Sequence, residues 1–406
     1  MQKRTILLNG STWSRSNNRL LVRHPPNDHC PAPAVGWPLH KGLVVVLTFI
    51  LLLATGCSGT TAGGGKIVIG AVLPFTGDNA QYGDNEKKGI ALALGEVKKR
   101  WPNLTVDVVY EDTKGEAKTA ALAIQKLKAQ GVKFFIDDAM SSVTFAMVPA
   151  LGLDGMMISA GATNPKLSGC SPYFFRIWNS DAEEGAQAAQ LSLKIRPGAK
   201  KVAVLYVNND YGVGLKDVYL RDVVKAIPGI AARDFSFEST QTNLRDLAAV
   251  VREFNPDLIY LVGYGPQTGL VVKELRAYRV TTGVVSTVTT EDPKFLERAG
   301  PAAEGVTYVY PKSPSGGEAD TFRSLYTKIF GGQPGILADH AYDAVLLYGM
   351  AFNSGAKTPD AAQSMLRSMP LYEGASGSIK FDANGDIHAP YDLKSVQRGA
   401  FAIFHE

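Results

Sequence analysis

Strand-like and helix-like hydrophobic patterns alternate from residue 66 onward, and this alternation constrains the fold more than any other feature of the sequence. Short apolar runs predict strands at residues 66–73, 106–110, 134–136 and 156–159. Between them, apolar residues recur at helical spacing over residues 90–97 and 117–127 and around residues 145–147. Alternation of this kind predicts a parallel sheet with helices on both faces.

The same alternation begins again in the middle of the chain. Helical patterns cover residues 183–195, 244–254 and 267–279 and follow Gly212, and apolar runs predict strands at residues 202–207 and 258–262. The sequence therefore predicts an α/β fold with two doubly wound, Rossmann-like units. Loops at the carboxyl ends of such strands are the usual ligand-binding elements.

An apolar stretch near the start of the chain predicts where the protein works. Residues 43–57 read LVVVLTFILLLATGC. The run of about a dozen apolar residues is shorter than the ~20 that span a bilayer, and Lys41 lies just upstream, as in a secretory signal. Small residues directly precede Cys57, an arrangement that resembles a bacterial lipobox, in which the cysteine receives lipid. A short transmembrane anchor with a coincidental cysteine is the alternative.

This interpretation divides the N-terminal part of the chain into two segments. Residues 1–56 are predicted to be a leader with a lipoprotein signal peptide, and the Gly/Ser/Thr-rich residues 57–65 a flexible, lipidated tether. The rest of the chain holds 36 Lys and Arg residues against 37 Asp and Glu residues. Because the remainder is nearly neutral, no electrostatic argument favours nucleic-acid binding.

The cysteines and histidines give no sign of a disulfide or a metal site. Cys170 is the one cysteine that follows Cys57, and the three histidines after residue 57 show no zinc-ligand spacing. Residues 382–386 read DANGD between apolar positions, which predicts a hairpin around Asn-Gly. A calcium loop is the weaker alternative, since Ile387 and Leu393 stand where that loop needs Gly and Glu. No cofactor is expected.

An ordered series of short motifs resembles the type I periplasmic binding proteins, and within them the leucine/isoleucine/valine-binding proteins of bacterial ABC importers. The matching stretches are IGAVLPFTG at 69–77, QYG at 81–83, YED at 110–112, SS at 141–142, SAGAT at 159–163, FFR at 174–176, DYG at 210–212, GY at 263–264, AEG at 303–305 and GSIKF at 377–381. The resemblance covers nearly all of residues 66–394.

The resemblance implies two α/β lobes joined by three hinge crossings, near residues 179–180, 310–311 and 375–376. The first lobe would comprise residues 66–180 plus 312–375, and the second residues 181–310 plus 377–406. The ligand would bind between the lobes, which close on it by hinge motion.

Helix N-termini supply the donors that an amino-acid carboxylate needs. Ser141 follows a predicted strand and opens a helix, and Gly161, Ala162 and Thr163 follow the next strand. From spacing alone, Ser141 is equally explained as a helix cap and residues 161–163 as a turn. The resemblance implies that the positions of Ser141, Gly161 and Thr163 hold the ligand's carboxylate and ammonium, with Ala162 between them.

Three tyrosines stand at predicted strand-to-helix junctions. Tyr82, Tyr211 and Tyr264 are each explained either as half-buried packing or as walls of an apolar pocket with a hydroxyl. The resemblance implies that all three reach the cleft, Tyr82 and Tyr211 beside the ligand's side chain and Tyr264 nearer its polar end.

The ammonium partner is the main departure from the family pattern. Leucine binders have a glutamate in the loop after the strand near residues 283–287, and ungapped counting puts Val288 there. A shift in the loop would return a carboxylate through Glu291, although a surface role is equally compatible. Without a carboxylate, the ligand would lack an α-amino group and be an amide, urea or a carboxylic acid.

The sequence therefore predicts a non-enzymatic, exported, lipid-anchored and monomeric solute receptor that delivers a small polar ligand to ABC permease subunits. A branched-chain amino acid is the expected ligand. No phosphate-binding loop and no nucleophile elbow occur, which disfavours an enzyme. A receptor of the same fold that senses amides, urea or small carboxylic acids is the alternative.

Overall fold

Five parallel strands form the sheet of the first lobe in the computed structural model, which describes residues 66–404. They are β1 (Ile67–Leu73), β2 (Val106–Asp112), β3 (Phe134–Ile136), β4 (Met156–Ser159) and β5 (Phe174–Arg176), in the order β2-β1-β3-β4-β5. β1 pairs in parallel with both β2 and β3, so the winding direction reverses between β1 and β3.

The second lobe repeats this winding. Its sheet contains β6 (Lys201–Val207), β7 (Ala231–Phe237), β8 (Leu258–Val262), β9 (Gly283–Ser286), β10 (Thr307–Pro311), β13 (Tyr391–Gln397) and β14 (Ala400–Ile403), in the order β14-β13-β10-β9-β8-β6-β7. The parallel strands β7-β6-β8-β9-β10 follow the same order as β2-β1-β3-β4-β5. β13 and β14 extend the sheet as an antiparallel pair.

Helices cover both faces of each sheet. The first lobe has α1 (Ala80–Arg100), α2 (Ala117–Ala129), α3 (Ser141–Leu151), α9 (Gly317–Phe330), α10 (Ala338–Asn353), α11 (Pro359–Ser368), the short η1 (Pro165–Leu167) and the paired β11 (Tyr372–Glu373) and β12 (Ser378–Ile379). The second has α4 (Asp181–Ile195), α5 (Asp210–Ala226), α6 (Arg245–Phe254), α7 (Gly265–Ala277), α8 (Pro293–Ala299), η2 (Val288–Glu291) and η3 (Gly300–Ala303).

The alternation of side chains along β1 shows how the core is divided. Ile69, Ala71 and Leu73 are fully buried with apolar residues of α1 and α10, whereas Val72 is buried with residues of α2 and α3. Because successive strand residues point to opposite faces, β1 is a central strand buried on both sides. The predicted doubly wound α/β fold is therefore confirmed.

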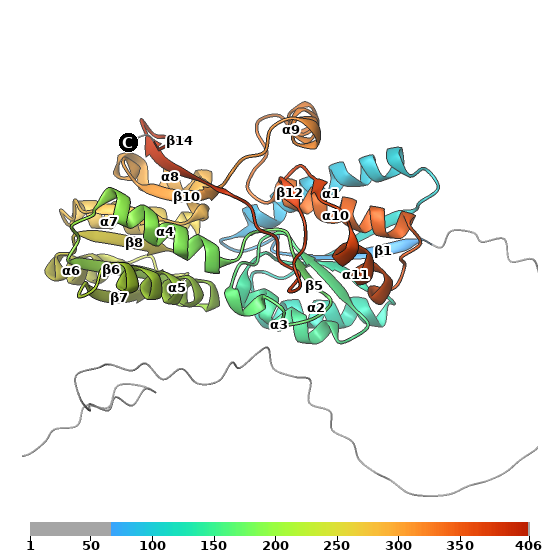
Figure 1. Cartoon of the computed structure of the whole chain (residues 1–406), viewed down its shortest axis with the longest axis horizontal. Helices are drawn as coiled ribbons and strands as arrows, with labels where there is room; N and C mark the ends of the chain where they lie inside the picture. Colours follow the sequence, from blue (N-terminus) through green and yellow to red (C-terminus); the bar gives the residue numbers. More distant parts are fainter. Residues whose placement is uncertain (1–65, 405–406) are drawn as a thin grey trace, which may run out of the picture.

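Three crossings connect the lobes and lie side by side. The Asn179 side chain donates to the carbonyl oxygen of Ala389 (2.7 Å) and accepts from its amide (2.8 Å), and the Lys312 amide donates to the Pro390 carbonyl (2.8 Å). Figure 1 shows the two lobes beside each other, with the last crossing running back to β14.

The third crossing lies later than expected from the sequence. Ile379, Phe381 and Ile387 are buried in the core of the first lobe, and the Arg176 amide donates to the Gly385 carbonyl (2.8 Å). We therefore infer that the crossing is at residues 389–390 and not at 375–376. The lobe boundaries otherwise stay predictions.

The hairpin expected at residues 382–386 is a turn without paired strands. Asp382 Oδ1 accepts from the amides of Asn384 (2.8 Å) and Asp386 (2.9 Å). The Asp382 amide also donates to the Asp386 carbonyl (2.8 Å), and the Gly385 carbonyl accepts from the Arg176 amide at the end of β5 (2.8 Å). β12 finds its partner in β11.

Two observations bear on membranes and metals. Among residues 66–404, no helix combines the length and hydrophobicity that crossing a membrane requires. The same residues contain no cluster of three or more His, Cys, Asp or Glu side chains suited to a metal ion. The predicted leader, Cys57 and the tether lie outside the described residues.

Candidate functional site

The carboxyl ends of the parallel strands face each other across the gap between the lobes, and a cavity lies there. Its space not filled by atoms is about 460 Å³, part of it open to solvent. The residues that line it follow strands of both sheets or belong to the loop before α10: Tyr82, Ala139, Met140, Ser141, Gly161, Thr163, Trp178, Tyr211, Tyr264, Val288, Thr289, Ile336 and Leu337.

Ser141 lies at the start of α3, and its hydroxyl is aimed at the neighbouring loop. Its Oγ accepts hydrogen bonds from the amides of Thr163 (3.3 Å) and Asn164 (3.1 Å). The N-cap position is Met140, so Ser141 does not cap its own helix. Because both bonds use the oxygen as acceptor, the hydroxyl hydrogen remains available to donate to a ligand. The free N–H groups of the first helical turn favour an anion at the same place.

Gly161 allows three parts of the cavity wall to approach closely. A Cβ atom at this position would lie 2.6 Å from Leu337 Cδ2 and 2.9 Å from the Ala139 Cβ. Both distances are shorter than real carbon contacts, so a larger residue would push the walls apart. Ala162 is different, because it is fully buried and does not line the cavity.

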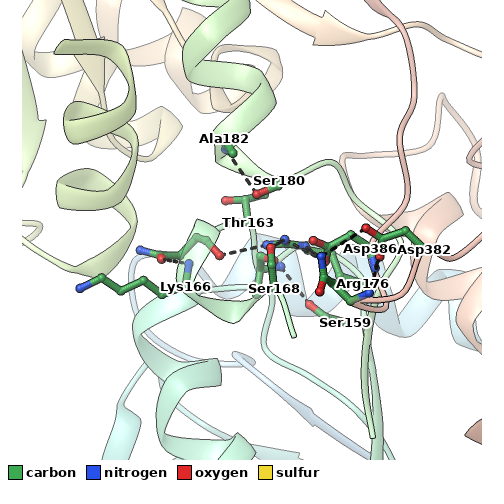
Figure 2. A network of polar contacts seen from close by, with 12 residues as sticks. Ser159, Thr163, Lys166, Ser168, Arg176, Ser180, Ala182, Asp382 and Asp386 are labelled. Atoms are coloured by element: carbon green, nitrogen blue, oxygen red, sulfur yellow. Dashed lines mark hydrogen bonds and ion pairs between the residues drawn. The ribbon is translucent and has the colours of Figure 1, made fainter. Parts of the chain in front are cut away.

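The Ala162 backbone contacts the protein and not the cavity. Its amide donates to the Ser159 hydroxyl (3.0 Å), and its carbonyl accepts from Arg176 (3.3 Å). The Arg176 guanidinium is fully buried, pairs with Asp386 (2.9 Å) and donates to the Ser168 hydroxyl (2.7 Å). Figure 2 shows Arg176 between the loop that carries Thr163 and the turn that carries Asp386. Arg176 therefore fixes the shape of the 161–168 loop.

The three predicted tyrosines are brought together. Tyr264 stacks on Tyr211, with ring centroids 5.6 Å apart and an interplanar angle of 24°, and its centroid is 6.4 Å from that of Tyr82 in the other lobe. Asn209 donates to the Tyr264 hydroxyl (3.2 Å), whereas the Tyr82 and Tyr211 hydroxyls have no partner among residues 66–404. The rings thus form an aromatic wall that both lobes share.

Burial raises the pKa of all three phenols, so each hydroxyl keeps its proton at physiological pH. For Tyr82, the charge of Asp292 adds to the effect of burial, and for Tyr211 the charges of Glu184 and Asp181 do so. Burial also raises the pKa of Tyr264. The tyrosines are therefore neutral hydrogen-bonding groups.

Glu291 lies away from the cavity. Its Oε1 accepts from the Tyr308 hydroxyl (2.7 Å), and the carboxylate forms an ion pair with Lys394. Val288 and Thr289 of η2 occupy the wall in its place. Val288, which ungapped counting assigns to the family's glutamate position, lines the cavity, and Glu291 does not. The lining residues named above include no Asp, Glu, Lys or Arg.

Several lining residues were not identified from the sequence. Trp178 stands two residues after the FFR motif, and its ring packs on His340 with centroids 4.3 Å apart. Ile336 and Leu337 come from the loop before α10, in a segment without periodic pattern. Leu337 has φ 76°, a left-handed conformation that only the tertiary structure specifies for such a residue.

The two lobes also contact each other beside the cavity. The Asn164 side chain, which belongs to the first lobe, donates to the Asp210 carbonyl at the start of α5 (2.5 Å). Gly214 in α5 would place a Cβ atom 2.5 Å from the same side chain. Asn164 and α5 therefore meet closely at the rim, and separation of the lobes would break this bond.

Comparisons with known proteins agree with this geometry. Residues 66–399 match the family described as periplasmic binding protein. A Leu/Ile/Val-binding protein homolog 1 from Brucella suis is 24% identical over 343 residues, covering 82% of this chain and 91% of that protein. The Leu/Ile/Val-binding protein BraC3 from Rhizobium johnstonii is 26% identical, covering 79% and 89%.

Solved structures share the fold over nearly their whole length. The leucine-binding protein LivK from Thermotoga maritima has a TM-score of 0.77 and 26% identity, covering 84% of this chain and 98% of that one. A solute-binding protein of an ABC transporter from R. palustris, solved with 4-hydroxybenzoate, has a TM-score of 0.75 and 20% identity, covering 84% and 96%.

Proposed function

The chain belongs to the periplasmic binding protein family, and from this premise we propose that it is the extracytoplasmic solute-binding component of an ABC importer. The observation that carries the proposal is the cavity between two doubly wound lobes, which is lined by Ser141 at the start of α3, by two threonines and three tyrosines, and otherwise mainly by apolar side chains. The protein carries out no chemistry in this proposal. It captures a ligand by closing the lobes, and the closed form docks on the permease.

The lining favours a small carboxylate with an apolar body. The Ser141 hydroxyl, the Thr163 hydroxyl and the N–H groups at the start of α3 are suited to a carboxylate. Val288, Ile336 and Leu337 are suited to a branched aliphatic side chain. A branched-chain amino acid meets both requirements, and the relatives named Leu/Ile/Val-binding proteins support this choice.

A carboxylic acid without an ammonium group is the second candidate. It is favoured by one specific observation, that no carboxylate side chain of residues 66–404 lines the cavity. Amides and urea belong to the same class of ligands without a positive charge. With such a ligand, the protein would act either as the receptor of an importer or as a ligand-sensing receptor with the same fold.

The cellular setting is also part of the proposal. We propose that the protein is exported, is anchored by lipid at Cys57 and acts as a monomer; the leader sequence supports the anchor, and the family supports export. Labelling with a fatty acid in a bacterial host tests the anchor, since Cys57→Ser should abolish incorporation of label.

A ligand screen by thermal shift and calorimetry tests the proposed function. The purified protein should be stabilised by leucine, isoleucine or valine, or, for the second candidate, by 4-hydroxybenzoate, acetamide or urea. Stabilisation follows from preferential binding to the folded state, about 2.7 kcal/mol at a ligand concentration of 100 times Kd. A protein that responds to none of these compounds would contradict the proposal.

A further inference from the structure

The first turn of α4 carries two carboxylates that do not line the cavity. Asp181 is 0% and Glu184 1% exposed. Three of their four carboxylate oxygens have no hydrogen-bond partner among residues 66–404. The fourth, Glu184 Oε1, accepts from the amide of Val288 (3.1 Å). Glu183, between them in sequence, contacts His388 near the protein surface instead.

This pair lies directly behind the cavity wall. The Asp181 amide donates to the Thr163 carbonyl (2.8 Å), and Glu184 holds Val288, so each carboxylate residue bonds a lining residue. Tyr211 is close to both the cavity and the pair: it lines the cavity, and burial together with the charges of Glu184 and Asp181 raises its pKa.

The protein supplies little positive charge to this region. The Thr163 hydroxyl and then the positive charge of Arg176 lower the pKa of Asp181, although burial outweighs both. The Arg176 guanidinium already pairs with Asp386 and donates to Ser168 and to two backbone carbonyls. The other titratable groups whose pKa responds to the pair are the hydroxyls of Tyr211, Tyr260, Tyr264 and Tyr391. Burial raises the pKa of both Asp181 and Glu184, because an ionised carboxylate is costly without a partner, and an ammonium group beside the pair would supply that partner and favour the ionised form.

We propose that Asp181 and Glu184 provide the negative potential that selects a ligand with an ammonium group, on the wall formed by Thr163, Val288 and Tyr211. This inference rests on the proposed function and specifies its ligand class. A carboxylate at the start of α3 and an ammonium group facing α4 place the two charged groups of an α-amino acid on adjoining parts of the wall, since Ser141 Oγ accepts from the Thr163 amide (3.3 Å). The pair would thereby attract a ligand's ammonium group, even though Val288 and not a glutamate is the η2 residue that lines the cavity there.

Titration calorimetry with two probes isolates the ammonium group. Leucine and isocaproate share the carboxylate and the branched chain, and only leucine carries the ammonium. We expect the wild-type protein to bind leucine at least about tenfold more tightly than isocaproate, since an opposite charge nearby favours the charged form by this order. Asp181→Asn and Glu184→Gln should bring the ratio of the two affinities towards one, with isocaproate binding unchanged or stronger.

Glu183→Gln is the matched control. It makes the same chemical change on the same helical turn, at a carboxylate that faces His388, and should leave the ratio unchanged. Thermal unfolding of each ligand-free variant shows whether that variant is folded. If Glu184→Gln does not fold, the affinity ratio for leucine over isocaproate of Asp181→Asn, compared with that of the wild type, tests the role of the pair.

The outcomes separate this inference from the proposed function. Equal wild-type affinities for leucine and isocaproate, or variants that lose both ligands in the same proportion, would overturn the role of the pair and leave a carboxylate-binding receptor. Binding of neither probe nor of any other compound in the ligand screen would instead remove the proposed function.

Discussion

Replacing Ser141 with alanine should lower both the stability of the ligand-free protein and its ligand affinity, for two separate reasons. The hydroxyl oxygen accepts from two buried amides, of Thr163 at 3.3 Å and Asn164 at 3.1 Å. Removing it leaves both donors without this partner, at a cost of about 1–3 kcal/mol. Because both bonds are long, we expect the lower half of that range and a decrease in Tm of a few degrees.

The effect on affinity comes from the donor side of the same hydroxyl. A hydrogen bond to a charged carboxylate contributes about 1.5–3 kcal/mol, which corresponds to roughly a 10- to 100-fold increase in Kd on removal. Ser142→Ala is the control, since Ser142 is the next residue of α3, is only partly buried and does not line the cavity.

Calorimetry with the best ligand from the screen and thermal unfolding without ligand measure the two effects separately. If the Ser141→Ala variant binds the ligand as tightly as the Ser142→Ala variant does, the proposed carboxylate site at the start of α3 is refuted. A loss of stability without any loss of affinity would show that Ser141 only supports the 161–168 loop.

Three further perturbations test other parts of the structure. Gly161→Ala should weaken ligand binding at least about tenfold, because its Cβ would lie 2.6 Å from Leu337 Cδ2 and distort the wall; unchanged affinity in calorimetry would contradict the close approach. Arg176→Met should destabilise the fold by about 3–5 kcal/mol in urea unfolding, since it leaves a buried carboxylate without its partner, and an unchanged midpoint would argue against the network. Glu183 raises the pKa of His388, so the stabilising contact is fully present below the unfolded pKa of about 6.5 and is lost as pH rises through the higher folded value. His388→Gln should therefore reduce Tm more at about pH 5.5 than at about pH 8.5, and equal losses at both pH values would exclude the contact.

The sequence predicts the strands of this fold well where they are buried on both faces. β1, β6 and β8 read as continuous apolar runs because helices cover both sides of each sheet. β7 was not predicted, because it is an edge strand with alternating exposure and only Phe235 and Phe237 buried. The position of the third crossing also escaped prediction, since it depends on the contact of Gly385 with Arg176, over two hundred positions away.

Site residues that directly follow a strand were the easiest to predict. Ser141, Tyr211 and Tyr264 stand at strand-to-helix junctions, and local sequence positions such residues at the sheet edge. Glu291 shows the limit of this reasoning, because its carboxylate pairs with Lys394 of β13, which lies far from η2 in the sequence.

The buried pair on α4 shows a different limit. Acidic residues in a first helical turn are ordinarily explained by the helix dipole, and nothing in the sequence distinguishes Asp181 and Glu184 from the half-buried Glu183 between them. Only the packing of α4 against η2 and the first lobe separates the two inward carboxylates from the outward one.

A crystal structure of the protein with leucine tests the central claim most directly. The account predicts leucine in the cavity between the lobes, with its carboxylate within hydrogen-bond distance of Ser141 Oγ and its ammonium facing Thr163 and the start of α4. Leucine bound outside this cavity, or bound with its two ends reversed, would contradict it.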